Sequence, residues 1–329
     1  MNNHISTSVQ KFWSPRLVLL SGREAFLFVT LIVLIVAISS GSGGAFFDPI
    51  NLNNLFVSSA ITLIPAVGMT AVILTGGIDV STGSMLGLCA AIGGTCFEFG
   101  WGIAASIPVF LLSGAFFGLV NALLIIKGRV PPVIATLGTL SIYRMLVFIV
   151  LGSNWITQIP PSLTTIFVVD HIFFLPVISI IAVALLIFST VFLRYFKAGR
   201  HIYAMGNNEE AARLAGIRPE RIKFAAYIIL GLLTGFAALM TLAQSPMAQT
   251  STGDGFVLQV IAAVVLGGTS LSGGKGTMLG TLLGTLVVEI VTDGIVLLHI
   301  QPFWGGVLLG AIILVAIGAS ARREEGGTI

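Results

Sequence analysis

Three ionisable side chains fall within otherwise apolar stretches of the chain, where a charge is costly and is a functional candidate by default. Arg144 lies in the apolar stretch 133–151, and Glu289 and Asp293 lie in 277–298. The two carboxylates are four residues apart, so a helix would place them on one face. Such a pair could relay protons or bind a cation, or it could neutralise Arg144 in a buried structural pair. We favour the structural pair, because one arginine and two carboxylates nearly balance.

Two glycine-rich segments interrupt the apolar pattern. The first, GGIDVSTGSMLG (76–87), places an aspartate and hydroxyl side chains between two apolar stretches and predicts a helix break near 76–82. Asp79 and Ser81 could accept hydrogen bonds from the free N–H groups that begin the next helix. They could equally contact a substrate, because broken helices commonly mark the binding regions of transporters.

The second segment, GGTSLSGGKGTMLG (267–280), predicts another break near 267–276. It is not a nucleotide-binding P-loop, since Thr269 and Gly276 occupy positions where that motif needs glycine and Ser or Thr. Cys89 and Cys96 are seven residues apart and the four histidines are scattered, so no metal-binding spacing is present. We expect this chain to bind no cofactor or metal. The candidate residues of a translocation path are Gly77, Asp79, Ser81, Asn121, Gly268 and Ser272.

The composition places these segments in a membrane protein. Hydrophobic residues make up 56% of the chain and charged residues 9%, whereas soluble domains carry about a quarter charged residues. Ten apolar stretches, two of them short, predict an all-α polytopic bundle of about ten transmembrane helices over residues 25–320. The stretches are 25–41, 56–75, 82–97, 103–126, 133–151, 173–193, 224–243, 257–268, 277–298 and 303–320.

Lysine and arginine fall in alternate connections between these stretches, which sets the expected orientation. Connections rich in these residues stay on the cytoplasmic side, so the segments 1–24 and 321–329 are both expected in the cytoplasm. The connections 42–55, 98–102, 152–172 and 244–256 contain carboxylates but no lysine or arginine. The basic isoelectric point is therefore a sign of topology, and nucleic-acid binding is a poor explanation for it. The basic residues are Lys11, Arg16 and Arg23; Lys127 and Arg129; seven residues of the loop 194–223; Lys275; and Arg322 and Arg323.

The loop 194–223 contains the polar run GRHIYAMGNNEEAARLAGIRPERIK, which predicts a short helix. Asn207 can cap a helix whose third residue is Glu210, a capping-box pattern, and Gly216 is its natural stop, followed by Pro219. So short a helix is stable only if it packs on something. Its alanines and Leu214 would suit a shallow cleft in another protein; a helix on the membrane surface and a solvated connector are the alternatives.

The motif EEAARLAG resembles the signature of ABC importer permeases, whose cytoplasmic coupling helix docks in a groove of the ATPase subunit. Four longer segments resemble the ribose-type sugar permeases in the same order, and together they extend from Pro65 to Leu298. The sequence departs from that family at Asp293-Gly294, where Asn-Gly is usual, and at Glu289. The loop GSNWITQIP is more similar to rhamnose and autoinducer-2 permeases. The four segments are TGGIDVSTGS, VPPVIATLGTLSIYRML, GRHIYAMGNNEEAARLAGI and VIAAVVLGGTSLSGGKGTMLGTLLG.

This resemblance implies a permease subunit, and not an enzyme, in the bacterial inner membrane. It implies uptake of a monosaccharide or related polyol that a periplasmic sugar-binding protein delivers. A second permease copy or homologue and two ATP-binding subunits, which would hold ATP and Mg, would complete the importer. The residues implied to contact the ATPase are Asn208, Glu209, Glu210, Ala211, Ala212, Leu214 and Gly216.

The alternative is a secondary transporter driven by protons or sodium, with Asp79, Glu289 and Asp293 as its ion sites. It explains the broken helices equally well but leaves the capped cytoplasmic helix without a role. An intramembrane enzyme is a distant third, because the sequence has no nucleophile and base in a recognisable arrangement.

Overall fold

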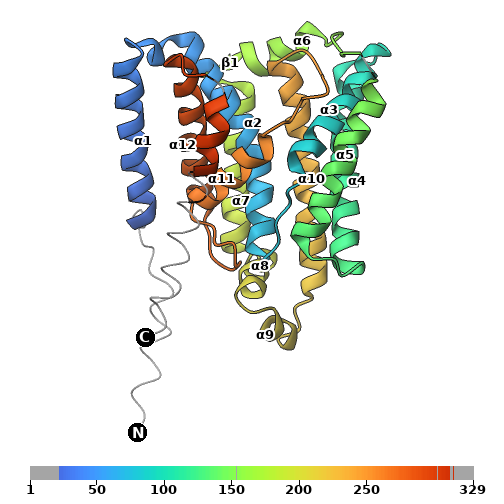
Figure 1. Cartoon of the computed structure of the whole chain (residues 1–329). Coiled ribbons are helices and arrows are strands. Elements are labelled where there is room, and N and C mark those ends of the chain that lie inside the picture. The colour runs from blue at the N-terminus through green and yellow to red at the C-terminus, as the bar shows by residue number, and fades with distance from the viewer. Residues whose placement is uncertain (1–21, 153, 302, 312–313, 315–329) are drawn as a thin grey trace.

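The structure is a computed structural model that describes residues 22–152, 154–301, 303–311 and 314 (Figure 1). It is an upright bundle of helices with one two-stranded hairpin, β1 (His171–Ile172) and β2 (Leu175–Pro176). The all-α polytopic fold is confirmed. The expected cytoplasmic segments 1–24 and 321–329 lie almost entirely outside the described residues, and the expected span 303–320 is described only at residues 303–311 and 314.

The long helices follow the apolar stretches of the sequence. Seven described helices are long and apolar enough to cross a membrane. They are α1 (Gly22–Gly41), α2 (Pro49–Leu74), α4 (Ile103–Ala122) with its π-helical extension η3 (Leu123–Lys127), α5 (Pro132–Leu151), α7 (Val177–Tyr195), α10 (Pro219–Gln244) and α12 (Met278–Leu297). The shorter elements are η2 (Ala45–Phe47), α3 (Thr82–Glu98), α6 (Pro161–Thr164), η4 (Thr165–Val169), α8 (Lys197–Asn207), α9 (Glu209–Leu214) and α11 (Phe256–Leu266).

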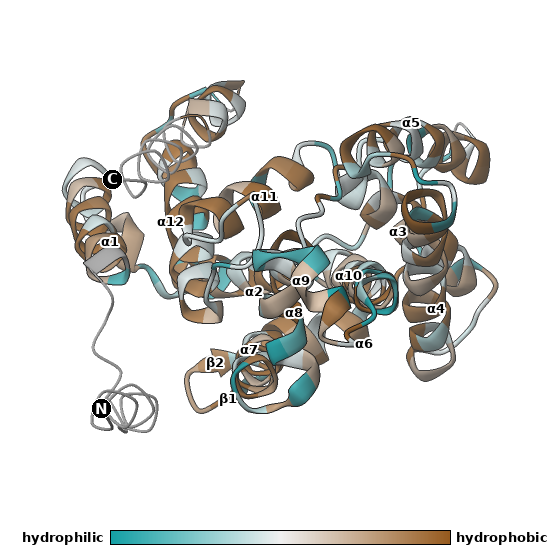
Figure 2. Ribbon diagram, turned by 90° about the horizontal axis from the view of Figure 1, so that it is seen from below, coloured by the Kyte–Doolittle hydropathy of each residue, from teal (hydrophilic) through white to brown (hydrophobic). Residues whose placement is uncertain are grey.

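The expected span at 257–268 is wrong, and α11 occupies this stretch instead. Its 11 residues extend about 16 Å, roughly half of the hydrocarbon thickness of a bilayer. Figure 2 shows α11 lying across the bundle, whereas α2, α7 and α10 are seen nearly end-on. An apolar run of this length reads the same whether the helix crosses the membrane or lies within the protein.

Helix α2 forms the centre of the bundle. From residue 57 to its end it is almost entirely buried, with α7, α10, α11 and α12 packed around it. Helix α10 packs most extensively against α4, where glycines bring the two backbones together: a Cβ on Gly114 would collide with the carbonyl oxygen of Gly231. Helix α1 packs at the edge of the bundle against α12 (Figure 1).

The two ends of the bundle differ in charge. The connections that carry lysine and arginine, including 195–219 and 267–277, lie at the end where α9 projects (Figure 1). Asp48, Glu98 and Asp170 belong to connections at the opposite end. Asp254 also belongs to a connection that starts at the opposite end, but that connection leaves the surface and runs down into the bundle.

Candidate coupling site and translocation path

Helix α9 begins at a side-chain cap. The Asn208 side-chain oxygen accepts a hydrogen bond from the backbone N–H of Ala211 at 2.9 Å. The predicted capping box of Asn207 and Glu210 is therefore wrong by one residue. Asn207 is the last residue of α8, and its amide donates to the carbonyl of Tyr203 at 2.8 Å.

The predicted stop of α9 at Gly216 is confirmed. Gly216 has a φ of +82°, which favours glycine over any residue with a Cβ. Its N–H donates to the carbonyl of Arg213, and the N–H of Ile217 donates to that of Ala212, both at 3.0 Å. This pair of bonds is a Schellman motif, which satisfies carbonyls at the helix end.

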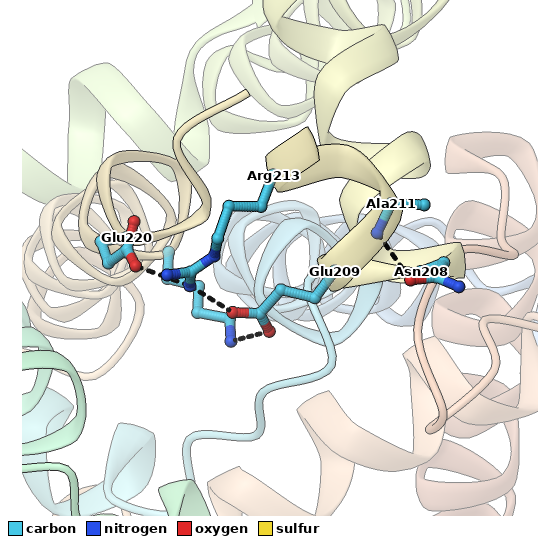
Figure 3. Close-up of polar contacts among 6 residues, drawn as sticks. Asn208, Glu209, Ala211, Arg213 and Glu220 are labelled. Carbon is cyan, nitrogen blue, oxygen red and sulfur yellow. Dashed lines mark hydrogen bonds and ion pairs between the residues drawn. The ribbon is translucent and has the colours of Figure 1, made fainter. Parts of the chain in front are cut away.

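An ion-pair network fixes α9 to the start of α10 (Figure 3). Arg213 contacts Glu220 at 2.7 Å and Glu209 at 3.4 Å, and Lys223 contacts Glu209 at 2.6 Å. Each pair is largely exposed and contributes less than about 1 kcal/mol by itself. Together with the caps at both ends, the network gives α9 a defined orientation on α10.

The two faces of α9 differ in exposure. Ala212 is only 5% exposed and lies against the rest of the chain, since α9 packs on α8 and α10. Leu214 is 86% exposed, and Ala211 and Glu210 are exposed beside it. The resemblance had implied that Ala212 contacts the ATPase. In this conformation its side chain is buried against its own chain and is not available at the surface. The outward face of α9 has Leu214 as its large apolar side chain.

Helix α8 links α9 to both glycine-rich segments. The Tyr203 hydroxyl donates to the carbonyl of Gly276 at 2.9 Å, and burial raises the pKa of this phenol, which keeps it a neutral donor. The N–H of Gly274 donates to the carbonyl of Leu74 at 3.0 Å. Gly206 lies against both groups, and a Cβ there would collide with the Leu74 carbonyl. Three segments distant in sequence thus meet at the end of α8.

In the first glycine-rich segment, Asp79 is the centre of a buried hydrogen-bond cluster. The Asp79 carboxylate accepts hydrogen bonds from the backbone N–H of Ser81 at 2.8 Å, from its hydroxyl at 2.6 Å and from the Asn121 amide at 2.8 Å. The Tyr143 hydroxyl lies 3.3 Å from the amide oxygen of Asn121. Asp79, Ser81 and Asn121 are completely buried. In this conformation these groups position the start of α3, and none of the three faces an open path.

The remaining path candidates, Gly77, Gly268 and Ser272, do not take part in the hydrogen bonds of this cluster. Gly77 is buried against Tyr227, whose hydroxyl donates to the carbonyl of Ile78 at 3.2 Å. Gly268 has a φ of +98° directly after α11, and Ser272 is exposed in the second segment. Both glycine-rich segments are irregular, as predicted. Whether their residues line the path stays a prediction.

The expected pairing of Arg144 with Glu289 and Asp293 is wrong. Glu289 is buried and accepts a hydrogen bond from the Thr62 hydroxyl at 2.6 Å; Asp293 is partly buried and accepts one from the Asn51 amide at 3.1 Å. Arg144 pairs instead with Asp254 at 2.6 Å. Among the described residues, no three histidine, cysteine, aspartate or glutamate side chains gather closely enough to hold a metal ion.

Residues 245–255, called the descending segment below, join the end of α10 to α11. Arg144 donates to the carbonyls of Thr250 and Thr252 at 2.9 and 3.0 Å, besides its ion pair with Asp254. The Thr252 carbonyl lies against Gly87 so closely that a Cβ there would collide with it. At 1.5 Å per residue, Gly87 is about 16 Å from the Glu98 end of α3. The descending segment therefore reaches well into the membrane depth.

The exposed polar groups of the descending segment must be covered by protein or be reached by water. Ser251, Asp254 and Gly255 are exposed in the single chain, and the Asp254 side chain is 61% accessible. Irregular polar backbone at membrane depth persists only where protein covers it or water reaches it. Sequence reasoning missed this feature. Its signal was present as an arginine within an apolar span and the polar run TSTGDG that follows α10.

Comparison with known proteins agrees with this architecture. Residues 51–317 match the family described as the permease component of the branched-chain amino acid transport system. The chain belongs to this permease family. It is 36% identical over 265 residues to the autoinducer 2 import system permease protein LsrC of Yersinia pseudotuberculosis serotype O:1b (strain IP 31758), over 79% of this chain and 74% of the relative. The LsrC of Yersinia enterocolitica serotype O:8 / biotype 1B is 35% identical over 274 residues, 82% of this chain and 74% of that protein.

No solved structure matches the chain. The permease family and the relatives confirm the prediction of a ribose-type ABC importer permease. The protein is thus a multi-pass permease of the bacterial inner membrane. The short capped helix and the two irregular glycine-rich segments that the sequence predicted are present, and contact of this helix with an ATPase subunit stays a prediction.

Proposed function

We propose that this permease, paired with a second copy or a homologous permease, imports a small neutral polyhydroxylated solute of the monosaccharide or autoinducer-2 type. Separate ATPase subunits supply the energy, and a periplasmic binding protein delivers the solute. The basic end of the bundle, where α9 projects (Figure 1), faces the cytoplasm, and the positive charges of the terminal segments predict that they lie on the same side. The relatives named for autoinducer 2 import and the loop GSNWITQIP support the solute class.

The observation that carries this proposal is the geometry of α9. A six-residue helix projects from the bundle, capped at both ends and fixed by ion pairs, with Leu214 turned outward. Exposure of an apolar side chain to water is unfavourable in free energy. Binding of a partner that covers Leu214, which is 86% exposed on an ordered helix, would therefore be stabilised by burying it. A groove in an ATPase subunit would accept this face, while Ala212 holds the opposite face against the permease.

Movement of α9 has a direct structural route into the bundle. Through α8, it reaches Gly274 and Gly276 of the second glycine-rich segment and Leu74 at the end of α2. Closure of the ATPase subunits would therefore act on the segments that precede α3 and α12. The exposed side of the descending segment, held by Arg144, is the surface we assign to the translocation path.

Reconstitution in proteoliposomes tests the energy source. Uptake should require ATP, the ATPase subunits and the binding protein, and it should survive collapse of proton and sodium gradients. Uptake by the permease alone, driven by an ion gradient, would contradict the proposal and support the secondary transporter.

The coupling contact is tested by replacing Leu214. We expect Leu214→Glu to weaken retention of the ATPase during co-purification by about 30-fold, the effect of losing about 2 kcal/mol at an interface hot spot. The amount of permease in the membrane should be normal, because Leu214 makes little contact with its own chain. Leu214→Met, which conserves volume, is the matched control and should retain both binding and uptake. Normal ATPase retention by Leu214→Glu would leave α9 a solvated connector.

A further inference from the structure

A polar pocket lies at the end of the bundle opposite α9, between the ends of α3 and α5. Its volume is about 360 Å³, at the lower end of the range of about 300–1,000 Å³ typical of small-molecule sites. Thr95 and Glu98 of α3 form one wall, and the loop 154–158 forms another. This loop belongs to GSNWITQIP, the stretch that is more similar to rhamnose and autoinducer-2 permeases than to ribose permeases.

The lining combines one aromatic surface with several hydrogen-bonding groups. Trp155 lines the pocket and is 59% exposed, so part of its side chain remains accessible to a ligand. Within the described part of the chain, the side chains of Glu98, Asn154 and Gln158 make no hydrogen bond or ion pair with the protein. Amides offer both donors and acceptors, and a carboxylate accepts from hydroxyl groups.

This chemistry suits a neutral polyol. The C–H groups on one face of a sugar ring stack on an indole, while its hydroxyls need a mixture of donors and acceptors. None of the described residues that line the pocket is lysine, arginine or histidine. A carboxylate ligand such as a branched-chain amino acid would find no cation here, and Glu98 would repel it.

The pocket is joined to the path that Arg144 holds. Ile156, in the pocket loop, forms a two-way backbone bridge with Ala248: the N–H of each residue donates to the carbonyl of the other, at 3.0 and 2.9 Å. Ala248 lies in the first half of the descending segment, which continues to Thr250 and Thr252, whose carbonyls accept hydrogen bonds from Arg144. A solute that leaves the pocket along this segment would meet backbone carbonyls and hydroxyls and would not have to cross a purely apolar surface.

From this arrangement we infer that the pocket is the outer binding site of the permease for its polyhydroxylated solute, with Trp155 as the stacking surface and Asn154 and Gln158 as hydroxyl-binding groups. The inference rests on the proposed import function and adds the place where the solute first contacts the permease. The binding protein also approaches this end of the bundle, so the experiment separates solute binding from docking.

Fluorescence of Trp155 tests binding without any partner protein. In the full-length permease in detergent micelles, Trp13, Trp101 and Trp304 are replaced by phenylalanine, which leaves Trp155 as the single indole in the sample. Titration with D-ribose or with autoinducer-2 should change its emission saturably in the millimolar range for at least one of them, and leucine should not. Asn154→Ala should weaken that binding by about tenfold. An emission that responds to neither solute, or to leucine equally, would overturn the inference.

The assembled importer supplies the second readout. Trp155→Ala should lower uptake at saturating solute by about tenfold while leaving stimulation of ATP hydrolysis by the binding protein unchanged. Trp101→Ala is the matched control, because Trp101 is an exposed indole at the same end that does not line the pocket. Equal loss of uptake and stimulation in Trp155→Ala would make the loop a docking surface and overturn the inference. If transport proved independent of the ATPase, the proposed function would be wrong. The fluorescence titration would still show whether the pocket binds the solute.

Discussion

The segment around Asp79 and the descending segment are both irregular backbone within the bundle, yet they are stabilised in different ways. In the first, a buried carboxylate accepts three hydrogen bonds from Ser81 and Asn121, and the cluster is closed to solvent. In the second, one guanidinium holds two carbonyls and Asp254 while the outer side stays exposed. A buried, fully bonded segment fixes a helix start, whereas an exposed one must face a partner or water.

The largest effect is expected at the buried cluster. Asp79→Ala removes the acceptor of the Ser81 N–H, of the Ser81 hydroxyl and of one N–H of the Asn121 amide in a completely buried place, although Asn121 can still donate to the Ser81 hydroxyl. We expect a loss of about 3 kcal/mol or more, since each buried donor that is left without an acceptor costs about 1–3 kcal/mol. The measurement is the amount of permease in the membrane and its unfolding temperature in detergent.

Asp79→Asn is the matched variant for this prediction. Its amide oxygen can still accept from Ser81, but its NH₂ group cannot replace the oxygen that accepts from Asn121, so an intermediate loss is expected. If Asp79→Ala accumulated and unfolded as the wild type does but transported nothing, Asp79 would belong to the translocation path and the distinction between the two segments would fail.

The sequence predicted what local chemistry decides. The stop of α9 followed from Gly216, because a left-handed residue after a helix favours glycine wherever it occurs. The cap was placed one residue early, since Asn207 and Asn208 are equally good caps in isolation. Contacts of α8 with Gly274 continue that helix through Asn207, and this tertiary effect leaves Asn208 to begin α9.

Features that depend on distant pairing could not be predicted. Arg144 was predicted to pair with Glu289 and Asp293 because these were the carboxylates found within apolar spans. Its partner is Asp254 in the descending segment, which has no periodic pattern to reveal its position. The apolar run of α11 likewise gave no indication that the helix lies across the bundle, because burial within the protein and burial in lipid select the same side chains. The outer pocket depends on the Ile156 and Ala248 bridge, which joins segments nearly a hundred residues apart.

A smaller effect on folding, with a clear effect on transport, is expected at Arg144. Arg144→Ala removes three contacts to the descending segment, but the backbone bridge at Ala248 and the bond from the Gln249 N–H to the Thr252 hydroxyl remain. The protein should accumulate, with uptake reduced about tenfold, a difference of about 1.4 kcal/mol in the barrier.

Two variants resolve how Arg144 acts. Arg144→Lys should restore uptake only partly, since an ammonium lacks the planar fork that reaches several oxygens at once. Asp254→Asn should have a smaller effect than Arg144→Ala, because the two hydrogen bonds from Arg144 to the carbonyls of Thr250 and Thr252 remain. Uptake assays with equal amounts of each variant measure whether the loss of uptake is larger in Arg144→Ala than in Arg144→Lys and Asp254→Asn. Wild-type uptake by Arg144→Ala would show that this segment is not part of the path.

The smallest effect is expected at Glu289, which resembles Asp79 in burial but has one bond of 2.6 Å, from Thr62. In Glu289→Gln the amide oxygen can still accept that bond, and in Asp293→Asn an oxygen remains for the Asn51 amide. Because both hydrogen bonds can persist and the proposed import is driven by ATP, we expect replacement of these carboxylates to have little effect on uptake. Uptake by each variant, and by both together, should stay within about twofold of wild type, less than about 0.5 kcal/mol in the barrier. Collapse of a pH gradient should change none of these rates. If Glu289→Gln accumulated normally but lost uptake, and wild-type uptake followed the gradient, these carboxylates would carry coupling ions, and the energy would come from the membrane potential or gradient and not from the partner bound at α9.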